Sequence, residues 1–221
     1  MSRAPRAVLF DLDGTLIDSA PDLASAANAL RALHGMPALP YDTLRPMVGS
    51  GARGMVGLAF GVAPGDDRFE VLRDAFLSCY AERLLVATKV FDAMAPVLIR
   101  LEAAGRPWGI VTNKAMRFTA PIVEGLDLHR RAAVVISGDT TPHSKPHPAP
   151  LLEAARRLGL DSADCVYIGD DRRDVEAGRS AGMATLAAAW GYLGASESIE
   201  DWGADAVLAS PGELLNWLEL A

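Results

Sequence analysis

The 221-residue sequence contains only two cysteines, Cys79 and Cys165, and they lie far apart without the spacing of a metal site. We expect both to be reduced thiols packed among apolar neighbours. Long apolar runs are also missing: no stretch approaches the roughly 20 residues that span a bilayer. The N-terminal apolar run stops at Asp11, which argues against a signal peptide. These absences predict a soluble, cytoplasmic protein without a membrane partner.

Runs of basic residues are absent as well. The net charge is −7, and this acidic balance argues against a nucleic-acid partner. The four histidines show no metal-ligand spacing; His143 and His147 flank Lys145 and either line a site or belong to a surface loop. Hydrophobic residues make up 50% of the chain, enough for a sizeable core. The length suits one large domain or a core with a small insert, and the sequence does not fix the oligomeric state.

Short apolar runs alternate with helical periodicity over most of the chain, which predicts an α/β fold with a doubly wound parallel sheet. The first buried strand covers residues 7–10, and Gly14 punctuates its end. Further strands are predicted at residues 108–112, 132–136, 165–169, 184–189 and 206–208. Helices are predicted at residues 94–104, 118–126, 149–158 and 175–181, and Pro211 opens a last one.

Residues 18–87 interrupt this alternation, because they show helical periodicity without a clear strand. The sequence therefore predicts a core domain made of residues 1–17 and 88–221, with an inserted helical domain at residues 18–87. An insert directly after the first strand would lie over the carboxyl edge of the sheet. That is the geometry of a cap or lid.

Two carboxylates, Asp11 and Asp13, follow the first strand directly. The carboxyl edge of a parallel sheet is where such folds keep their chemistry. In an extended chain both side chains would point to one face. Like charges held that close are costly unless a cation lies between them or one is protonated. The pair suggests a metal ion, an acid/base pair or both, whereas the alternative is a solvated turn.

Thr112 and Asn113 end the second predicted core strand. A hydroxyl and backbone N–H groups at a strand-to-helix junction can hold phosphate oxygens. The alternative is a plain helix N-cap.

Lys145 lies in a stiff Ser-Lys-Pro-His-Pro loop between the third and fourth core strands. A lysine placed there can act as a point charge on a phosphate and on a nucleophilic carboxylate. Lys114 is a weaker candidate for a second cation, and a lone lysine is more often a solvated surface group.

Three aspartates close the fourth core strand. Asp170 at the strand end is best placed to bind a metal, and Asp174 lies one helical turn further on. Oxygen ligands without a histidine cluster favour Mg²⁺. For Asp171 and Asp174 the alternative is an acidic helix N-terminus that interacts with the helix dipole.

The four motifs resemble, in order, those of the haloacid dehalogenase superfamily of aspartate-nucleophile phosphatases. They read Asp-x-Asp-Gly-Thr, Thr-Asn, Lys-Pro and Gly-Asp-x-x-x-Asp, and the resemblance covers nearly the whole chain. It implies that Asp11 is the nucleophile and Asp13 the general acid and base. It also implies that Mg²⁺ is held by Asp11, the backbone carbonyl of Asp13 and Asp170, and that Lys145 stabilises the transferred phosphoryl group.

The predicted cap is the part expected to choose the substrate, a small phosphate monoester. Its segment at residues 49–53 is similar to that of phosphoglycolate phosphatases, with Gly51 allowing close approach and Arg53 available for a carboxylate. Arg53 is alternatively a solvated helix residue. Other stretches resemble phosphatases of N-acetylmuramic acid 6-phosphate, among them residues 111–121 and 202–205. Both substrates carry a carboxylate and a phosphate ester.

Other functions share parts of this pattern. A phosphomutase has the same four motifs, and only its products distinguish it. A 2-haloacid dehalogenase would use Asp11 but has no leaving alkoxide to protonate, so Asp13 argues against it. A binding module without catalysis is expected to have lost at least one of the four key residues, namely Asp11, Asp13, Lys145 and Asp170.

Overall fold

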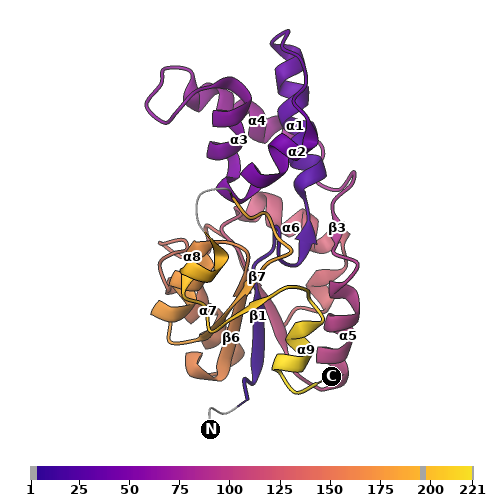
Figure 1. Ribbon diagram of the computed structural model, residues 1–221, viewed down its shortest axis with the longest axis vertical. Helices are drawn as coiled ribbons and strands as arrows, with labels where there is room; N and C mark the ends of the chain where they lie inside the picture. Colours follow the sequence, from indigo (N-terminus) through magenta and orange to yellow (C-terminus); the bar gives the residue numbers. More distant parts are fainter. Residues whose placement is uncertain (1–3, 195–197, 221) are drawn as a thin grey trace. The chain divides into compact units, whose positions relative to one another are not determined.

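The protein is described by a computed structural model that covers residues 4–194 and 198–220. The chain forms two compact units, one made of residues 1–17 and 90–221 and the other of residues 18–89. The first unit is built on a six-stranded parallel sheet (Figure 1). Its strand order is β5(Val134–Ile136), β4(Trp108–Val111), β1(Ala7–Phe10), β6(Cys165–Gly169), β7(Ala184–Ala188) and β8(Ala206–Leu208).

The strand order indicates where on the sheet a ligand is expected to bind. Both neighbours of β1 arrive late in the sequence, β4 on one side and β6 on the other. The direction of winding therefore reverses between β1 and β6. In open α/β sheets, ligands bind at the carboxyl ends of the strands beside such a switch point. Phe10 of β1 is in register with Ile110 and Ile168, so the residues that follow these three strands emerge at one level.

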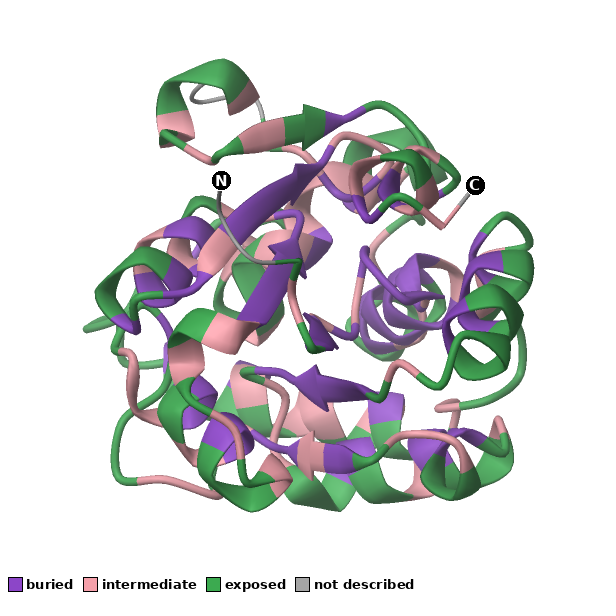
Figure 2. Cartoon of the chain, turned by 90° about the horizontal axis from the view of Figure 1, so that it is seen from below, coloured by how far each residue is buried: buried purple, intermediate pink, exposed green. Residues whose placement is uncertain are grey.

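The central strands are buried because helices cover them, and Figure 2 shows these strands in the colour of buried residues. One face packs on α7(Ala149–Leu158) and α8(Arg172–Ser180). Alternate strand residues belong to this cluster, including Leu9 and Tyr167. The remaining helices of the unit are α5(Met94–Ala103), α6(Met116–Gly125) and α9(Glu213–Trp217).

The predicted strands and helices are all present, with shifts at several ends. The strand predicted from residue 132 begins at Val134. The helix predicted from residue 175 begins at Arg172, because Asp171 caps it there. A prediction from apolar periodicity misses these first residues, since the first turn is polar. Similarly, α6 begins at Met116, two residues before the first apolar residue of its periodic pattern.

The second unit contains helices and is held together by their apolar faces. Its helices are α1(Ala20–Leu33), α2(Tyr41–Leu44), α3(Gly51–Phe60) and α4(Phe69–Ala81), with a 3-10 turn at Arg45–Ser50. Asp22 of α1 fastens the end of the unit, since its carboxylate accepts hydrogen bonds from the backbone of Ala87 and from the backbone and hydroxyl of Thr88.

The two units are joined by two chain segments that pair with each other. These are β2(Ile17–Asp18) and β3(Lys89–Val90), which form a two-stranded sheet. The second boundary therefore falls two residues later than residue 87, because this short strand carries no hydrophobic pattern of its own. Within the described residues, no helix is long and apolar enough to cross a membrane.

Both cysteines are free thiols. Cys165 is buried in β6, and this burial raises the pKa of its thiol to about 11. Cys79 is half-buried. The expectation of unpaired cysteines is confirmed.

Candidate active site

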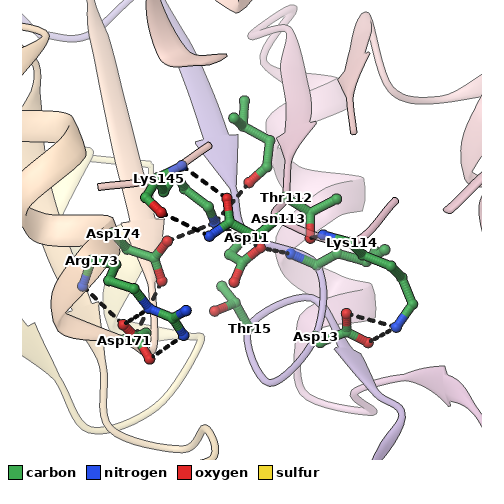
Figure 3. Close-up of polar contacts among 12 residues, drawn as sticks. Asp11, Asp13, Thr15, Thr112, Asn113, Lys114, Lys145, Asp171, Arg173 and Asp174 are labelled. Atoms are coloured by element: carbon green, nitrogen blue, oxygen red, sulfur yellow. Dashed lines mark hydrogen bonds and ion pairs between the residues drawn. The ribbon is translucent and has the colours of Figure 1, made fainter. Parts of the chain in front are cut away.

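Asp11 and Asp13 leave the end of β1 and take different partners. The backbone N–H of Asp11 donates to the carbonyl of Ile168, which continues the pairing of β1 with β6 by one residue. Its Oδ1 lies 3.0 Å from the Nζ of Lys145. The carboxylate of Asp13 instead contacts the Nζ of Lys114 (Figure 3). The chain enters a turn at Leu12 and is no longer extended, so alternation along a strand does not place Asp13, and a face shared with Asp11 stays a prediction.

Lys145 lies at the centre of the site and is only 4% exposed. Its Nζ lies 3.0 Å from Asp11 Oδ1, 2.6 Å from Asp174 Oδ1 and 2.7 Å from the hydroxyl of Tyr167, and the Val111 carbonyl is 3.1 Å away. Burial alone would lower the pKa of Lys145, but the attraction of Asp11 and Asp174 outweighs it and raises the pKa. Lys145 is therefore a charged buried group and not a surface lysine.

Asn113 holds the loop that carries Lys145. Its amide N–H donates to the carbonyl of Lys145, and its Oδ1 accepts from the backbone N–H of the same residue, both at 2.9 Å. The loop after β5 also lies close, since a Cβ on Gly138 would fall 2.1 Å from the Asn113 carbonyl oxygen. The spacing alone did not indicate this clamp, because it joins two motifs that are 32 residues apart.

Thr112 does not cap a helix. Helix α6 begins four residues later with Ala115 at its N-cap position, and the carboxylate of Asp139 accepts from the backbone N–H of its first residue, Met116, at 2.8 Å. The Thr112 hydroxyl accepts a hydrogen bond from the backbone N–H of Lys114 at 3.2 Å. The residue is buried at the end of β4, beside the residues that follow β1. A phosphate-binding role is compatible with this position.

Asp170 is buried at the end of β6 with both carboxylate oxygens partnered. Oδ1 accepts from the Thr15 hydroxyl at 3.0 Å, and Oδ2 accepts from the backbone N–H of Tyr192 at 2.7 Å. Burial and the nearby charges of Asp11 and Asp174 raise the pKa of Asp170 well above its usual value. The hydrogen bond from Thr15 joins residues that are 155 positions apart in the sequence.

Two glycines make room for Asp170. A Cβ on Gly14 would lie 2.1 Å from Asp170 Oδ2, and the φ of Gly14 is +83°, which also favours glycine. A Cβ on Gly191 would lie 2.2 Å from the Cβ of Asp170. The loops after β1 and β7 therefore close tightly on this carboxylate.

Asp171 and Asp174 begin α8 as a capping box. The Asp171 side chain accepts from the backbone N–H of Arg173, while the Asp174 side chain accepts from the backbone N–H of Asp171. Burial alone would raise the pKa of Asp171, but hydrogen bonds from Arg173 outweigh it and lower the pKa. Asp171 therefore stabilises the N-terminus of α8, which is the alternative that the sequence analysis gave for it.

Asp174 combines that capping role with a place in the site. Its Oδ1 lies 2.6 Å from Lys145 Nζ and 3.2 Å from the Tyr167 hydroxyl. Burial raises its pKa to about 7, because the opposing effect of Lys145 is smaller. The motif spacing indicated the proximity of Asp174 to Asp170 but not its contact with Lys145.

Three carboxylates could hold a metal ion. Oxygens of Asp11, Asp170 and Asp174 lie within 4.8 Å of one another. Their mutual repulsion, which raises the pKa of Asp170, fits a cation, and the all-oxygen donor set fits Mg²⁺. The carboxylate of Asp13 contacts Lys114. The candidate metal ligand of Asp13 is therefore its backbone carbonyl.

The remaining candidate residues are exposed. Gly51 and Arg53 are exposed residues of α3 in the helical unit, and their role stays a prediction. His143 and His147 are exposed, and their rings lie 4.4 Å apart in the loop around Lys145. They belong to that loop's surface.

A family model described as haloacid dehalogenase-like hydrolase matches residues 8–188, and the chain belongs to this family. It is 42% identical over 216 residues to the N-acetylmuramic acid 6-phosphate phosphatase of Pseudomonas aeruginosa, covering 98% of this chain and 96% of that one. It is 45% identical over 212 residues to the phosphoglycolate phosphatase of Xanthomonas campestris pv. campestris, covering 96% of each.

Solved structures agree with this assignment. A protein from Haemophilus somnus, described as a predicted phosphoglycolate phosphatase, matches with a TM-score of 0.84 and 25% identity over 98% of this chain and 99% of that one. The fold, the carboxylate–lysine cluster and these relatives together define a hydrolase of the phosphatase class.

Proposed function

We propose that the protein is a Mg²⁺-dependent phosphomonoester hydrolase that works through an aspartyl-phosphate on Asp11. The observation that carries the proposal is the contact of Asp11 Oδ1 with Lys145 Nζ at 3.0 Å, next to Asp170 and Asp174. Asp11 lies beside one buried ammonium group and two further carboxylates. It is suited to attack a phosphate only when the negative charges of these carboxylates are neutralised.

In the first half-reaction, a carboxylate oxygen of Asp11 attacks phosphorus and forms the aspartyl-phosphate. The bond from phosphorus to the ester oxygen breaks, and the leaving alkoxide takes a proton from Asp13. Lys145 stabilises the negative charge on the transferred group. Thr112 and the backbone near it would hold phosphate oxygens.

In the second half-reaction, water attacks phosphorus and gives its proton to Asp13, so that phosphate leaves and Asp11 is regenerated. Mg²⁺, held by Asp11, the backbone carbonyl of Asp13 and Asp170, would supply the positive charge that offsets the phosphate and the carboxylates. Asp174 would support this arrangement through its contact with Lys145.

The proposed substrate is 2-phosphoglycolate, with N-acetylmuramic acid 6-phosphate as the alternative. Relatives at similar identity carry each of the two names. Both molecules have a carboxylate besides the phosphate ester, and Arg53 with Gly51 is the candidate group for recognising it. The proposed role of the helical unit is that of a cap over the substrate.

Phosphate release from a panel of monoesters tests the proposal. The panel contains both substrates, glycerol phosphate and glucose 6-phosphate, each with Mg²⁺ and with excess EDTA. A kcat/KM for one carboxylate-bearing ester well above the rest supports the assignment. Absence of turnover on every ester would contradict the phosphatase function, and an isomerised sugar phosphate without phosphate release would indicate a mutase.

A further inference from the structure

The side chain of Tyr167 extends from strand β6 to the ammonium group of Lys145. Tyr167 lies in β6, three residues before Asp170, and is 1% exposed. It belongs to the apolar cluster between the sheet and helices α7 and α8. A phenylalanine would fill the same volume, so packing alone does not account for the hydroxyl group.

The hydrogen bonds around Lys145 give that hydroxyl a role. The Tyr167 hydroxyl lies 2.7 Å from the Val111 carbonyl and 2.7 Å from Lys145 Nζ. Its one hydrogen has two acceptors within reach, the Val111 carbonyl at 2.7 Å and Asp174 Oδ1 at 3.2 Å, and we assign it to the nearer carbonyl, so that the hydroxyl oxygen accepts from the ammonium group. The three N–H groups of Lys145 then go to Tyr167, Asp174 and Asp11, which are its three shortest contacts.

We infer that Tyr167 is a positioning residue that directs the ammonium group of Lys145 toward Asp11. The inference rests on the proposed function for its kinetic consequence, though not for the contact itself. Without the hydroxyl, the freed N–H of Lys145 has the Val111 carbonyl at 3.1 Å as its nearest other acceptor. The ammonium group would then shift toward Val111 and away from the carboxylate that receives the phosphoryl group.

The kinetic test compares Tyr167→Phe with Tyr80→Phe, a matched change at another buried tyrosine, in the helical unit. Because Lys145 acts on the transferred phosphoryl group, we expect kcat to fall roughly tenfold in Tyr167→Phe, with KM changed less than about threefold. Tyr80→Phe should retain the wild-type kcat. A kcat for Tyr167→Phe within twofold of wild type overturns the inference, and so does an equal loss in both variants.

A second readout does not depend on activity. The sequence has only three lysines, Lys89, Lys114 and Lys145. Side-chain ¹⁵N labelling of lysine therefore gives a simple spectrum, in which the buried Lys145 ammonium signal is assigned by its loss in Lys145→Met. We expect this signal to shift, or to vanish through faster proton exchange, in Tyr167→Phe and not in Tyr80→Phe.

The two readouts distinguish a failure of the Tyr167 inference from a failure of the proposed function. A Lys145 signal that keeps its position and exchange rate in Tyr167→Phe overturns the contact, whatever the enzyme does. A wild-type protein that hydrolyses no ester contradicts the proposed function, while the spectra still decide whether Tyr167 anchors Lys145.

Discussion

The Nζ of Lys114 lies 2.9 Å from Oδ2 and 3.0 Å from Oδ1 of Asp13, so one ammonium group contacts both oxygens of the proposed general acid and base. The two side chains are 9% and 20% exposed, and the pair is therefore only partly screened by water. Lys114 follows the Thr-Asn motif that comes directly after β4, whereas Asp13 follows β1. The pair links the two strand ends on the side of the site away from Lys145 (Figure 3).

Replacing Lys114 by methionine should lower kcat/KM by roughly three- to thirtyfold, because the Asp13 carboxylate loses a charged partner that fixes its orientation. Lys114→Arg should recover part of the loss, since a guanidinium group also contacts both oxygens of a carboxylate. The measurement is steady-state kinetics on the preferred ester.

The double variant decides whether Lys114 acts through Asp13. In the Asp13→Asn background, Lys114→Met should cost little more, because the carboxylate is already gone. Independent losses that multiply in the double variant would mean that Lys114 contacts the substrate instead.

Asp11→Asn should abolish phosphate release while the protein stays folded, because an amide oxygen is a poor nucleophile. It should not lower the melting temperature in EDTA, since Asp11 is one of the charges that raise the pKa values of Asp170 and Asp174. Circular dichroism and thermal unfolding check the fold. Appreciable turnover by the folded variant would remove Asp11 from its proposed role.

The sequence predicted the fold and the main strand-end residues because both depend on local patterns. Short apolar runs mark β1, β4 and β6, and the carboxyl ends of parallel strands meet at one edge of the sheet. Asp11 and Asp170 were located in this way. Their closeness follows from strand order and register, because each directly follows one of two adjacent strands, β1 and β6.

The contacts of Lys114, Asn113 and Tyr167 were not predicted, because they join segments that are distant in the sequence. Asn113 clamps a loop 32 residues away, and Lys114 pairs with a residue 101 positions earlier. Tyr167 looked like one of several apolar strand residues, and only the alternation of β6 hints at its direction. The turn at Leu12, which separates Asp13 from Asp11, is likewise invisible to a parity argument that assumes an extended chain.

Activity should require Mg²⁺ and be lost in excess EDTA, because Asp11, Asp170 and Asp174 would otherwise repel a phosphate dianion. Ca²⁺ should substitute poorly, since its larger and looser coordination misplaces the phosphate. Mg²⁺ should also raise the melting temperature of the wild-type protein by binding only the folded state, and this rise should shrink in Asp170→Asn. Full activity in the chelated enzyme would contradict the proposed metal requirement.

Arg53→Ala tests the proposed recognition of a substrate carboxylate by the helical unit. Arg53 is exposed on α3, so its loss should leave the fold unchanged. Removing one charge-assisted hydrogen bond is worth roughly 1.5–3 kcal/mol, so kcat/KM for 2-phosphoglycolate or N-acetylmuramic acid 6-phosphate should fall about ten- to a hundredfold. Turnover of p-nitrophenyl phosphate, which has no carboxylate, should scarcely change.

Lys145→Ala provides the contrast, because Lys145 contacts Asp11 and is proposed to act on the phosphoryl group common to all esters. It should lower kcat/KM for every substrate, p-nitrophenyl phosphate included. The informative quantity is the ratio of kcat/KM between carboxylate-bearing and carboxylate-free esters. This ratio should fall in Arg53→Ala and stay near its wild-type value in Lys145→Ala. Equal losses on both kinds of ester in Arg53→Ala would show that Arg53 supports the helical unit or the phosphate, and carboxylate recognition would then have to be assigned to other residues.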